Sequence, residues 1–210
     1  MLNVLRTSLT LIMVLVFFST ASARNYDEGI EYQRLKEPVP TQVGPGKIEV
    51  VELFWYGCPH CFRLEPGLNK WLKSKPKNVE FIRIPAVFNK IWALHAKVYY
   101  TAKFLGIIGK FHKAFFDAIH LKKEPMNTVA EVKKFFIQQG VSAKKFDNVF
   151  NSFGVDAKVR RARELSREYG ISGVPTLVVD GKYRTDGPMA GGHKGMIEVL
   201  NYLIKKESGK

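Results

Sequence analysis

The spacing of hydrophobic positions changes along the chain and first predicts strands. An almost continuous apolar run at residues 48–55 predicts a buried strand, and residues 79–84 predict a second one. Between them, residues 58–72 have apolar positions at helical spacing. Pro59 falls where a helix start tolerates a missing N–H, and Pro66 should kink the helix. Together these segments predict a βαβ unit with two parallel strands.

The middle of the chain has helical spacing throughout. Glycines end several of the segments, and Thr128 with Glu131 forms the signature of a capping box. The pattern predicts helices over residues 91–105, 110–120, 128–140, 142–153 and 156–169.

Strand signals return near the C-terminus. The pair Asp180-Gly181 is typical of a tight turn between two strands, and helical spacing follows from residue 193 to about residue 206. The two ends of the chain should therefore form halves of one sheet, with a helical insertion between them. We expect the sheet domain to comprise residues 24–89 and 170–210, and the insertion to comprise residues 90–169.

The N-terminal residues read as an export signal. Arg6 precedes an apolar run over residues 9–18, and Ala21-Ser22-Ala23 matches a small-residue cleavage site. The run is well short of the roughly 20 residues that a membrane-spanning helix needs. We expect residues 1–23 to be a signal peptide that is cleaved after Ala23.

The composition narrows the possible partners. The 210 residues carry a formal net charge of +14, and 46% of them are hydrophobic, which is enough for a proper core. A basic chain could bind nucleic acid. The basic residues here are spread singly and in doublets over polar helix faces, so we expect a solvated surface and no nucleic-acid partner.

The only two cysteines lie three residues apart in Cys58-Pro59-His60-Cys61. A bridge between them would close a loop of about four residues, which adds only roughly 2 kcal/mol of stability. In an oxidising compartment the pair is better explained as a reactive dithiol. A structural zinc ion needs four ligands. The other histidines have no ligand spacing and should be ordinary surface or half-buried residues: His95, His112, His120 and His193.

These features together resemble a known family. A strand leading to C-x-x-C at a helix start, with a later X-Pro before a hairpin, resembles thioredoxin folds. The Cys-Pro-His-Cys sequence, the helical insertion and Gly173-Val174-Pro175 are similar to the DsbA family of periplasmic thiol oxidases over essentially the whole mature chain. The resemblance implies an α/β thioredoxin-like fold with an inserted all-helical domain.

The resemblance also implies an activity and partners. The chain would be a periplasmic protein disulfide oxidoreductase with no cofactor beyond its own Cys58–Cys61 disulfide. Its partners would be reduced or unfolded exported proteins and a DsbB-type, quinone-linked oxidase of the inner membrane, and the chain would be a monomer. A reductase or isomerase on the same fold is the alternative, and a non-enzymatic binder is a third reading.

The two sulfurs should have different roles. Cys58 falls at a helix N-terminus, where free N–H groups and the helix dipole favour a thiolate, so we expect it to be the exposed nucleophile. His60 would favour the thiolate further, as a cation or as a hydrogen-bond donor. A stabilised thiolate makes the disulfide oxidising. Cys61, one turn further on, should be buried and should resolve the mixed disulfide.

A buried acid should lie beside the cysteines. Glu52 has apolar neighbours on the first strand, so we expect partial burial and a raised pKa. The resemblance implies that this residue helps to move a proton at the buried cysteine. Family members often place a lysine near this acid. Here the second strand offers Arg83, which stays charged and permits an ion pair.

A second loop should lie next to the cysteines. The resemblance implies a cis peptide bond at Val174-Pro175, whose backbone groups pair with an extended substrate strand. Trp55, Tyr56 and Phe62 flank the cysteine motif. They should form either an apolar lip around the site or part of the core.

Overall fold

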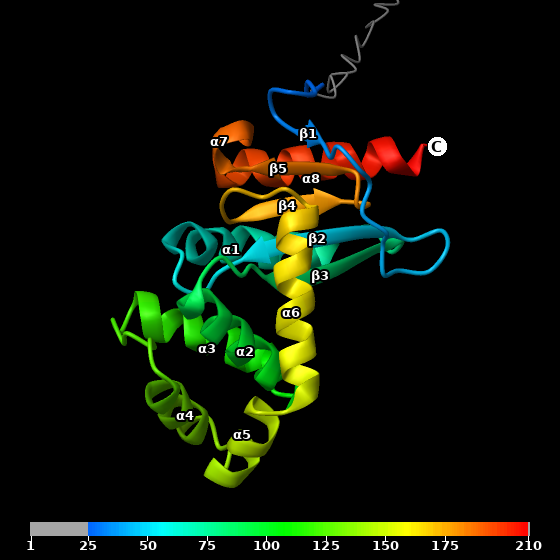
Figure 1. Cartoon of the computed structure of the whole chain (residues 1–210). Coiled ribbons are helices and arrows are strands. Elements are labelled where there is room, and N and C mark those ends of the chain that lie inside the picture. The colour runs from blue at the N-terminus through cyan, green and yellow to red at the C-terminus, as the bar shows by residue number, and fades with distance from the viewer. Residues whose placement is uncertain (1–24, 210) are drawn as a thin grey trace, which may run out of the picture.

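Figure 1 shows the computed structural model of the chain, in which residues 25–209 are described. The predicted signal peptide, residues 1–23, lies outside the described residues. Within the described part of the chain, no helix is both long and apolar enough to cross a membrane.

The described residues form one five-stranded sheet with the strand order β1-β5-β4-β2-β3. The parallel pairing of β2 with β3 confirms the predicted βαβ unit, and β4 runs antiparallel to both β2 and β5. The two ends of the chain therefore share one sheet, as predicted. The strands are β1 (Gln33–Arg34), β2 (Ile48–Phe54), β3 (Val79–Pro85), β4 (Thr176–Val179) and β5 (Tyr183–Asp186).

Helices cover both faces of this sheet. One hydrophobic core packs α1 and α8 against one face of the sheet. A second hydrophobic core packs helices α2–α6, which we call the helical block, against the opposite face. In Figure 1 the block lies to one side of the sheet, and the long α6 leads back to β4. The helices are α1 (Pro59–Ser74), α2 (Lys90–Phe104), α3 (Ile108–His120), α4 (Val129–Gln138), α5 (Ala143–Phe150), α6 (Phe153–Glu168), α7 (Gly187–Ala190) and α8 (His193–Ser208).

Local sequence signals explain where several elements begin and end. Thr128 and Glu131 form the predicted capping box at the start of α4. Asp180 and Gly181 both have positive φ angles, 52° and 60°, as the tight turn between β4 and β5 requires. A side chain at Gly181 is also excluded by space, because its Cβ would lie 1.9 Å from the carbonyl oxygen of Val39.

Several elements differ from the prediction, and α5 ends at Phe150 rather than at residue 153. The short β1 was not predicted as a strand, because a two-residue strand leaves no periodic pattern. It is held by backbone pairing with β5, and Leu35 N–H extends that contact to the carbonyl of Lys182 at 2.7 Å. The four-residue α7 was not predicted. Helix α6 begins at Phe153 rather than at residue 156, because the Ser152 side chain caps it.

The helical block depends on a tightly packed aromatic core, and Phe136→Ala should test it. Phe136 is fully buried and stacks on Phe111 with the ring centroids 4.4 Å apart. Its truncation should lower the free energy of unfolding by about 3–5 kcal/mol. Ile137→Ala on the same helix is the control, because Ile137 is 48% exposed. Guanidinium denaturation should show a change within about 0.5 kcal/mol for this control, and equal losses would contradict the assignment of the core.

Candidate active site

The cysteine pair lies at the start of α1, and both thiols are free. Cys58 is the N-cap residue and Pro59 begins the helix. Within the described chain no side chain caps this helix end, so its first backbone N–H groups are available to the sulfur. The backbone N–H groups of His60 and Cys61 donate to Cys58.

This environment lowers the pKa of Cys58 to about 6. The largest cause is the hydrogen bond with the Cys61 thiol. Burial opposes the shift, while the two backbone N–H groups and the charge of His60 add to it. Burial raises the pKa of Cys61 well above its ordinary value, so Cys61 keeps the proton that it donates. The helix start and His60 lower the pKa of Cys58 as predicted, but the hydrogen bond from the Cys61 thiol lowers it most.

Cys58 is less accessible than predicted. It is 8% exposed, against 0% for Cys61, so it is the more accessible sulfur but not an open one. The peptide bond between Val174 and Pro175 is cis, as predicted. The Cys58 thiol donates to the carbonyl oxygen of Val174 at 3.3 Å, and this loop therefore lies directly against the sulfur.

His60 lies on the exposed side of the pair. Arg63 Nη2 donates to its Nδ1 at 3.0 Å. The ring of His193 meets His60 edge-on, with the centroids 6.0 Å apart. The site therefore has basic groups on its solvent side.

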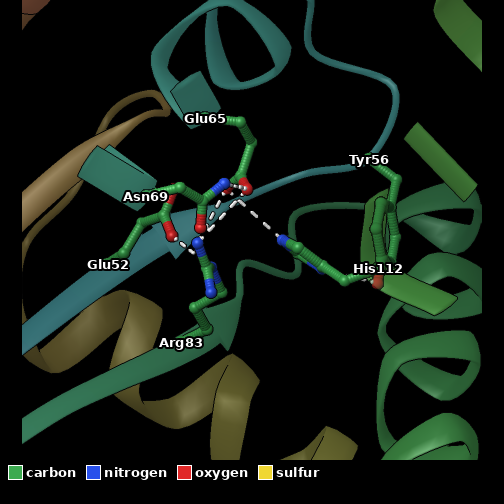
Figure 2. Close-up of polar contacts among 6 residues, drawn as sticks. All are labelled: Glu52, Tyr56, Glu65, Asn69, Arg83 and His112. Atoms are coloured by element: carbon green, nitrogen blue, oxygen red, sulfur yellow. Dashed lines mark hydrogen bonds and ion pairs between the residues drawn. The ribbon is translucent and has the colours of Figure 1, made fainter. Parts of the chain in front are cut away.

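Glu52 acts electrostatically on Cys61 and is fully buried. Figure 2 shows its contact with Arg83. Its Oε2 accepts from Arg83 Nε at 2.8 Å, so the ion pair that Arg83 permits is formed. Its Oε1 is buried with no hydrogen-bond partner among residues 25–209. Burial raises the pKa of Glu52 to about 7, against the opposing charge of Arg83.

Sequence reasoning missed the rest of this polar cluster. Arg83 Nη2 also donates to Glu65 at 3.0 Å, and Glu65 accepts from Asn69 at 2.9 Å. His112 Nε2 lies 3.4 Å from Glu65, and its Nδ1 lies 2.9 Å from the hydroxyl oxygen of Tyr56 (Figure 2). Glu65 follows the buried Cys61 by four residues, and this spacing was the available sign that both face inward.

The histidine prediction was wrong for two residues. His95 is only 2% exposed and His112 only 6%. Both lie on helices with many buried apolar residues. These apolar neighbours were the sign in the sequence that the two histidines are buried. Within residues 25–209, no group of three or more His, Cys, Asp or Glu residues could hold a metal ion.

The aromatic residues near the motif divide between the two expected roles. Tyr56 is fully buried and belongs to the core. Trp55 is half-buried and stacks on Trp92 with the ring centroids 4.5 Å apart. Its ring lies over Gly57, where an added Cβ would lie 2.3 Å from it. Phe62 is also half-buried and stacks on His120. Trp55 and Phe62 therefore leave apolar surface beside the cysteines.

The reduced protein should show a thiolate at unusually low pH. Ultraviolet absorbance should detect ionisation of Cys58 with a midpoint near pH 6. In Cys61→Ala the midpoint should rise toward the ordinary value of 9.0, because the strongest hydrogen-bond donor is lost. Cys58→Ala is the control and should show no step near pH 6. A wild-type midpoint near 9 would contradict this account.

The same shift links stability to pH. The pKa of Cys58 is lower in the folded than in the unfolded reduced protein. Its stabilising effect is therefore fully present above the unfolded pKa and is lost as the pH falls through about 6. Relative to Cys58→Ala, the reduced wild type should lose unfolding free energy between pH 9 and pH 6. Parallel urea-denaturation profiles for the two proteins would rule this out.

The chain is similar to known proteins over nearly its whole length. The family model of the DSBA-like thioredoxin domain matches residues 82–203. The thiol:disulfide interchange protein DsbA of Pseudomonas aeruginosa is 42% identical over 207 residues, which are 99% of this chain and 97% of that protein. The protein of the same name from Azotobacter vinelandii is 42% identical over 85% of this chain and 83% of its own length.

Solved structures agree with these relatives. The crystal structure of Pseudomonas aeruginosa DsbA matches with a TM-score of 0.83 at 42% identity, over 88% of this chain and 95% of that one. The structure of the oxidoreductase DsbA from Xylella fastidiosa matches with a TM-score of 0.82 at 32% identity, over 88% and 99% of the two chains. The chain therefore belongs to the DsbA family of thioredoxin-fold proteins.

Proposed function

We propose that this protein is a periplasmic thiol:disulfide oxidoreductase that donates its Cys58–Cys61 disulfide to newly exported proteins. The observation that carries the proposal is the difference between the two sulfurs. The pKa of Cys58 is lowered to about 6, whereas the pKa of Cys61 is raised. A thiolate that is stable in the reduced form makes the disulfide the higher-energy state, and the disulfide is therefore readily given up.

The exchange proceeds in two balanced steps. A substrate thiolate attacks the sulfur of Cys58, the bond between Cys58 and Cys61 breaks, and Cys61 leaves and takes up a proton. A second substrate thiolate then attacks the substrate sulfur of the mixed disulfide, and Cys58 leaves as a stabilised thiolate. The substrate loses two electrons and the enzyme pair gains them. The raised pKa of Cys61 slows its return attack, which would release the substrate still reduced.

Glu52 is the proton exchanger of this reaction. A pKa of about 7 allows it to give a proton to Cys61 during substrate oxidation and to take one when the pair is reoxidised. Its Oε1, which has no hydrogen-bond partner within residues 25–209, is available for that transfer. Arg83 holds the other carboxylate oxygen in place, and its own charge does not change.

Four further residues complete the site, and two aromatic side chains flank it. Pro59 starts α1 without an N–H and so leaves the following N–H groups to the sulfur. His60 favours the thiolate through its charge. Val174 and Pro175 lie against Cys58 and present backbone groups to an extended substrate segment, which Trp55 and Phe62 flank with apolar surface.

Membership of the DsbA family supports the following partners. Substrates are reduced or unfolded exported proteins, which the chain meets in the periplasm after cleavage of the signal peptide near Ala23. A DsbB-type, quinone-linked oxidase of the inner membrane accepts the electrons and restores the disulfide, and the protein acts as a monomer. The division into residues 24–89, 90–169 and 170–210 separates the sheet that carries the cysteines from the helical insertion.

The oxidase activity depends on one sulfur. The oxidised protein should form disulfides in a reduced model substrate, measured by loss of free substrate thiols. Cys58→Ala should abolish this activity, because the mixed disulfide cannot form. Phe153→Ala is the control, since Phe153 is 80% exposed on α6, and it should retain wild-type activity. Full activity of Cys58→Ala would end the proposal.

The redox potential separates an oxidase from a reductase on the same fold. Equilibration with glutathione should give a potential for the Cys58–Cys61 pair well above that of thioredoxin, which is about −270 mV. Each tenfold change in the exchange equilibrium corresponds to about 30 mV. A potential at or below the thioredoxin value would instead favour a reductase.

A further inference from the structure

Two buried carboxyls, those of Glu52 and Glu65, share the guanidinium of Arg83 (Figure 2). Arg83 donates from Nε to Glu52 at 2.8 Å and from Nη2 to Glu65 at 3.0 Å. Two carboxylates and one guanidinium would leave one uncompensated negative charge in a buried site, which is costly. One proton held by the cluster removes that charge. The chemistry of the site therefore depends on which carboxyl holds the proton.

The two carboxyls have unequal sets of donors. Glu65 accepts from Asn69 at 2.9 Å and from His112 at 3.4 Å, in addition to Arg83. Glu52 has only Arg83, and its Oε1 has no partner in the described part of the chain. Hydrogen bonds to a carboxylate favour its ionised form. Burial tends to raise the pKa of Glu65, but its bonds with His112, Arg83 and Asn69 outweigh this and lower it.

The tautomer of His112 follows from its two neighbours. Burial lowers the pKa of His112 and raises that of Tyr56, so the ring is neutral and the phenol keeps its proton. An ionised Glu65 can only accept, which places the His112 proton on Nε2 and leaves Nδ1 bare. The hydroxyl of Tyr56 donates to that bare nitrogen across 2.9 Å. The donors therefore run in one direction, from Tyr56 through His112 to Glu65.

We propose that His112 is a positioning residue for disulfide exchange, because its hydrogen bond keeps Glu65 ionised and so leaves Glu52 to carry the proton that is exchanged at Cys61. This inference rests on the proposed function, since only the exchange reaction uses a proton at Cys61. His112 lies on α3 of the helical block. The block contributes neither cysteine nor the cis-proline loop, but it controls the proton chemistry beside them.

Other ionisable groups around the cluster come from each element packed against it. Glu65 comes from α1, Arg83 from β3, Tyr56 from the β2–α1 connection and Tyr99 from α2. The negative charge of Glu65 raises the pKa of His112, and the positive charge of Arg83 lowers it. Because a neutral His112 adds no net charge to this group, its replacement by a neutral residue removes hydrogen bonds but no charge.

The test compares His112→Phe with His112→Gln. Phenylalanine fills the aromatic site but donates nothing, whereas the glutamine amide can donate to Glu65 and accept from Tyr56. The glutamate carboxyl carbons are labelled with carbon-13 and titrated by NMR in the reduced protein. A Glu52→Gln variant assigns the Glu52 resonance. In His112→Phe the Glu52 midpoint should fall by about one pH unit, which is tenfold in its acid dissociation constant. In His112→Gln it should stay at the wild-type value.

Two outcomes would overturn the proposal: an unchanged Glu52 midpoint in folded His112→Phe, or an equal fall in both variants. If His112→Phe does not fold, Tyr56→Phe replaces it. This variant loses only the hydroxyl that fixes the His112 tautomer, and it should also lower the Glu52 midpoint. No shift there would equally reject the inference.

The titration distinguishes this inference from the proposed function, because it is measured without substrate. If the wild type oxidises no substrate but the Glu52 midpoint falls in His112→Phe, only the proposed function is rejected. A wild-type protein that is active, with a midpoint insensitive to His112, would reject only the role of His112.

Discussion

Hydrogen bonds converge on the sulfur of Cys58 at the first turn of α1, and the chemistry of the protein depends on them. The donors are the Cys61 thiol and the backbone N–H groups of His60 and Cys61. They are available because Pro59 starts the helix and no side chain of the described chain caps it. The sheet and the helical block hold α1 in this place, since Cys61 is packed in the core between them.

The two sides of the cysteine pair have different surroundings. The solvent side carries His60 and Arg63, and the cis-proline loop lies against the sulfur there. The inner side carries the buried carboxyls around Arg83. Cys58 is thus the sulfur open to another protein in the proposed exchange, while the carboxyls assigned to its proton are buried. A low-dielectric interior strengthens each of these polar contacts and makes each unpaired group expensive.

The sequence allowed much of this arrangement to be predicted. The βαβ unit, the hairpin at Asp180-Gly181 and the capping box at Thr128 each follow from local rules that tertiary contacts did not override. The apolar neighbours of Glu52 indicated partial burial, and the side chain is fully buried. The family resemblance, rather than periodicity, indicated the cis bond before Pro175.

Other parts could not be read from the sequence, for physical reasons. The pairing of β1 depends on backbone hydrogen bonds to a distant strand, which leave no side-chain pattern. The contact of His112 with Glu65 joins two residues that lie 47 positions apart in the sequence, on different helices. The sequence around either residue does not indicate its partner. The strongest donor to Cys58 was missed because a thiol is a weak donor in general and becomes important only at close range in a buried site.

The pairing of β1 with β5 has a consequence for the order in which the chain can assemble. The side chains of Gln33 and Arg184, one on each strand, are in contact across 151 residues of sequence. A chain that is made from its N-terminus presents β1 first and the partner of β1 almost last. Local units such as β2-α1-β3 have every partner they need much sooner. A strand near one end of the described residues is thus secured only once its partner near the other end is present.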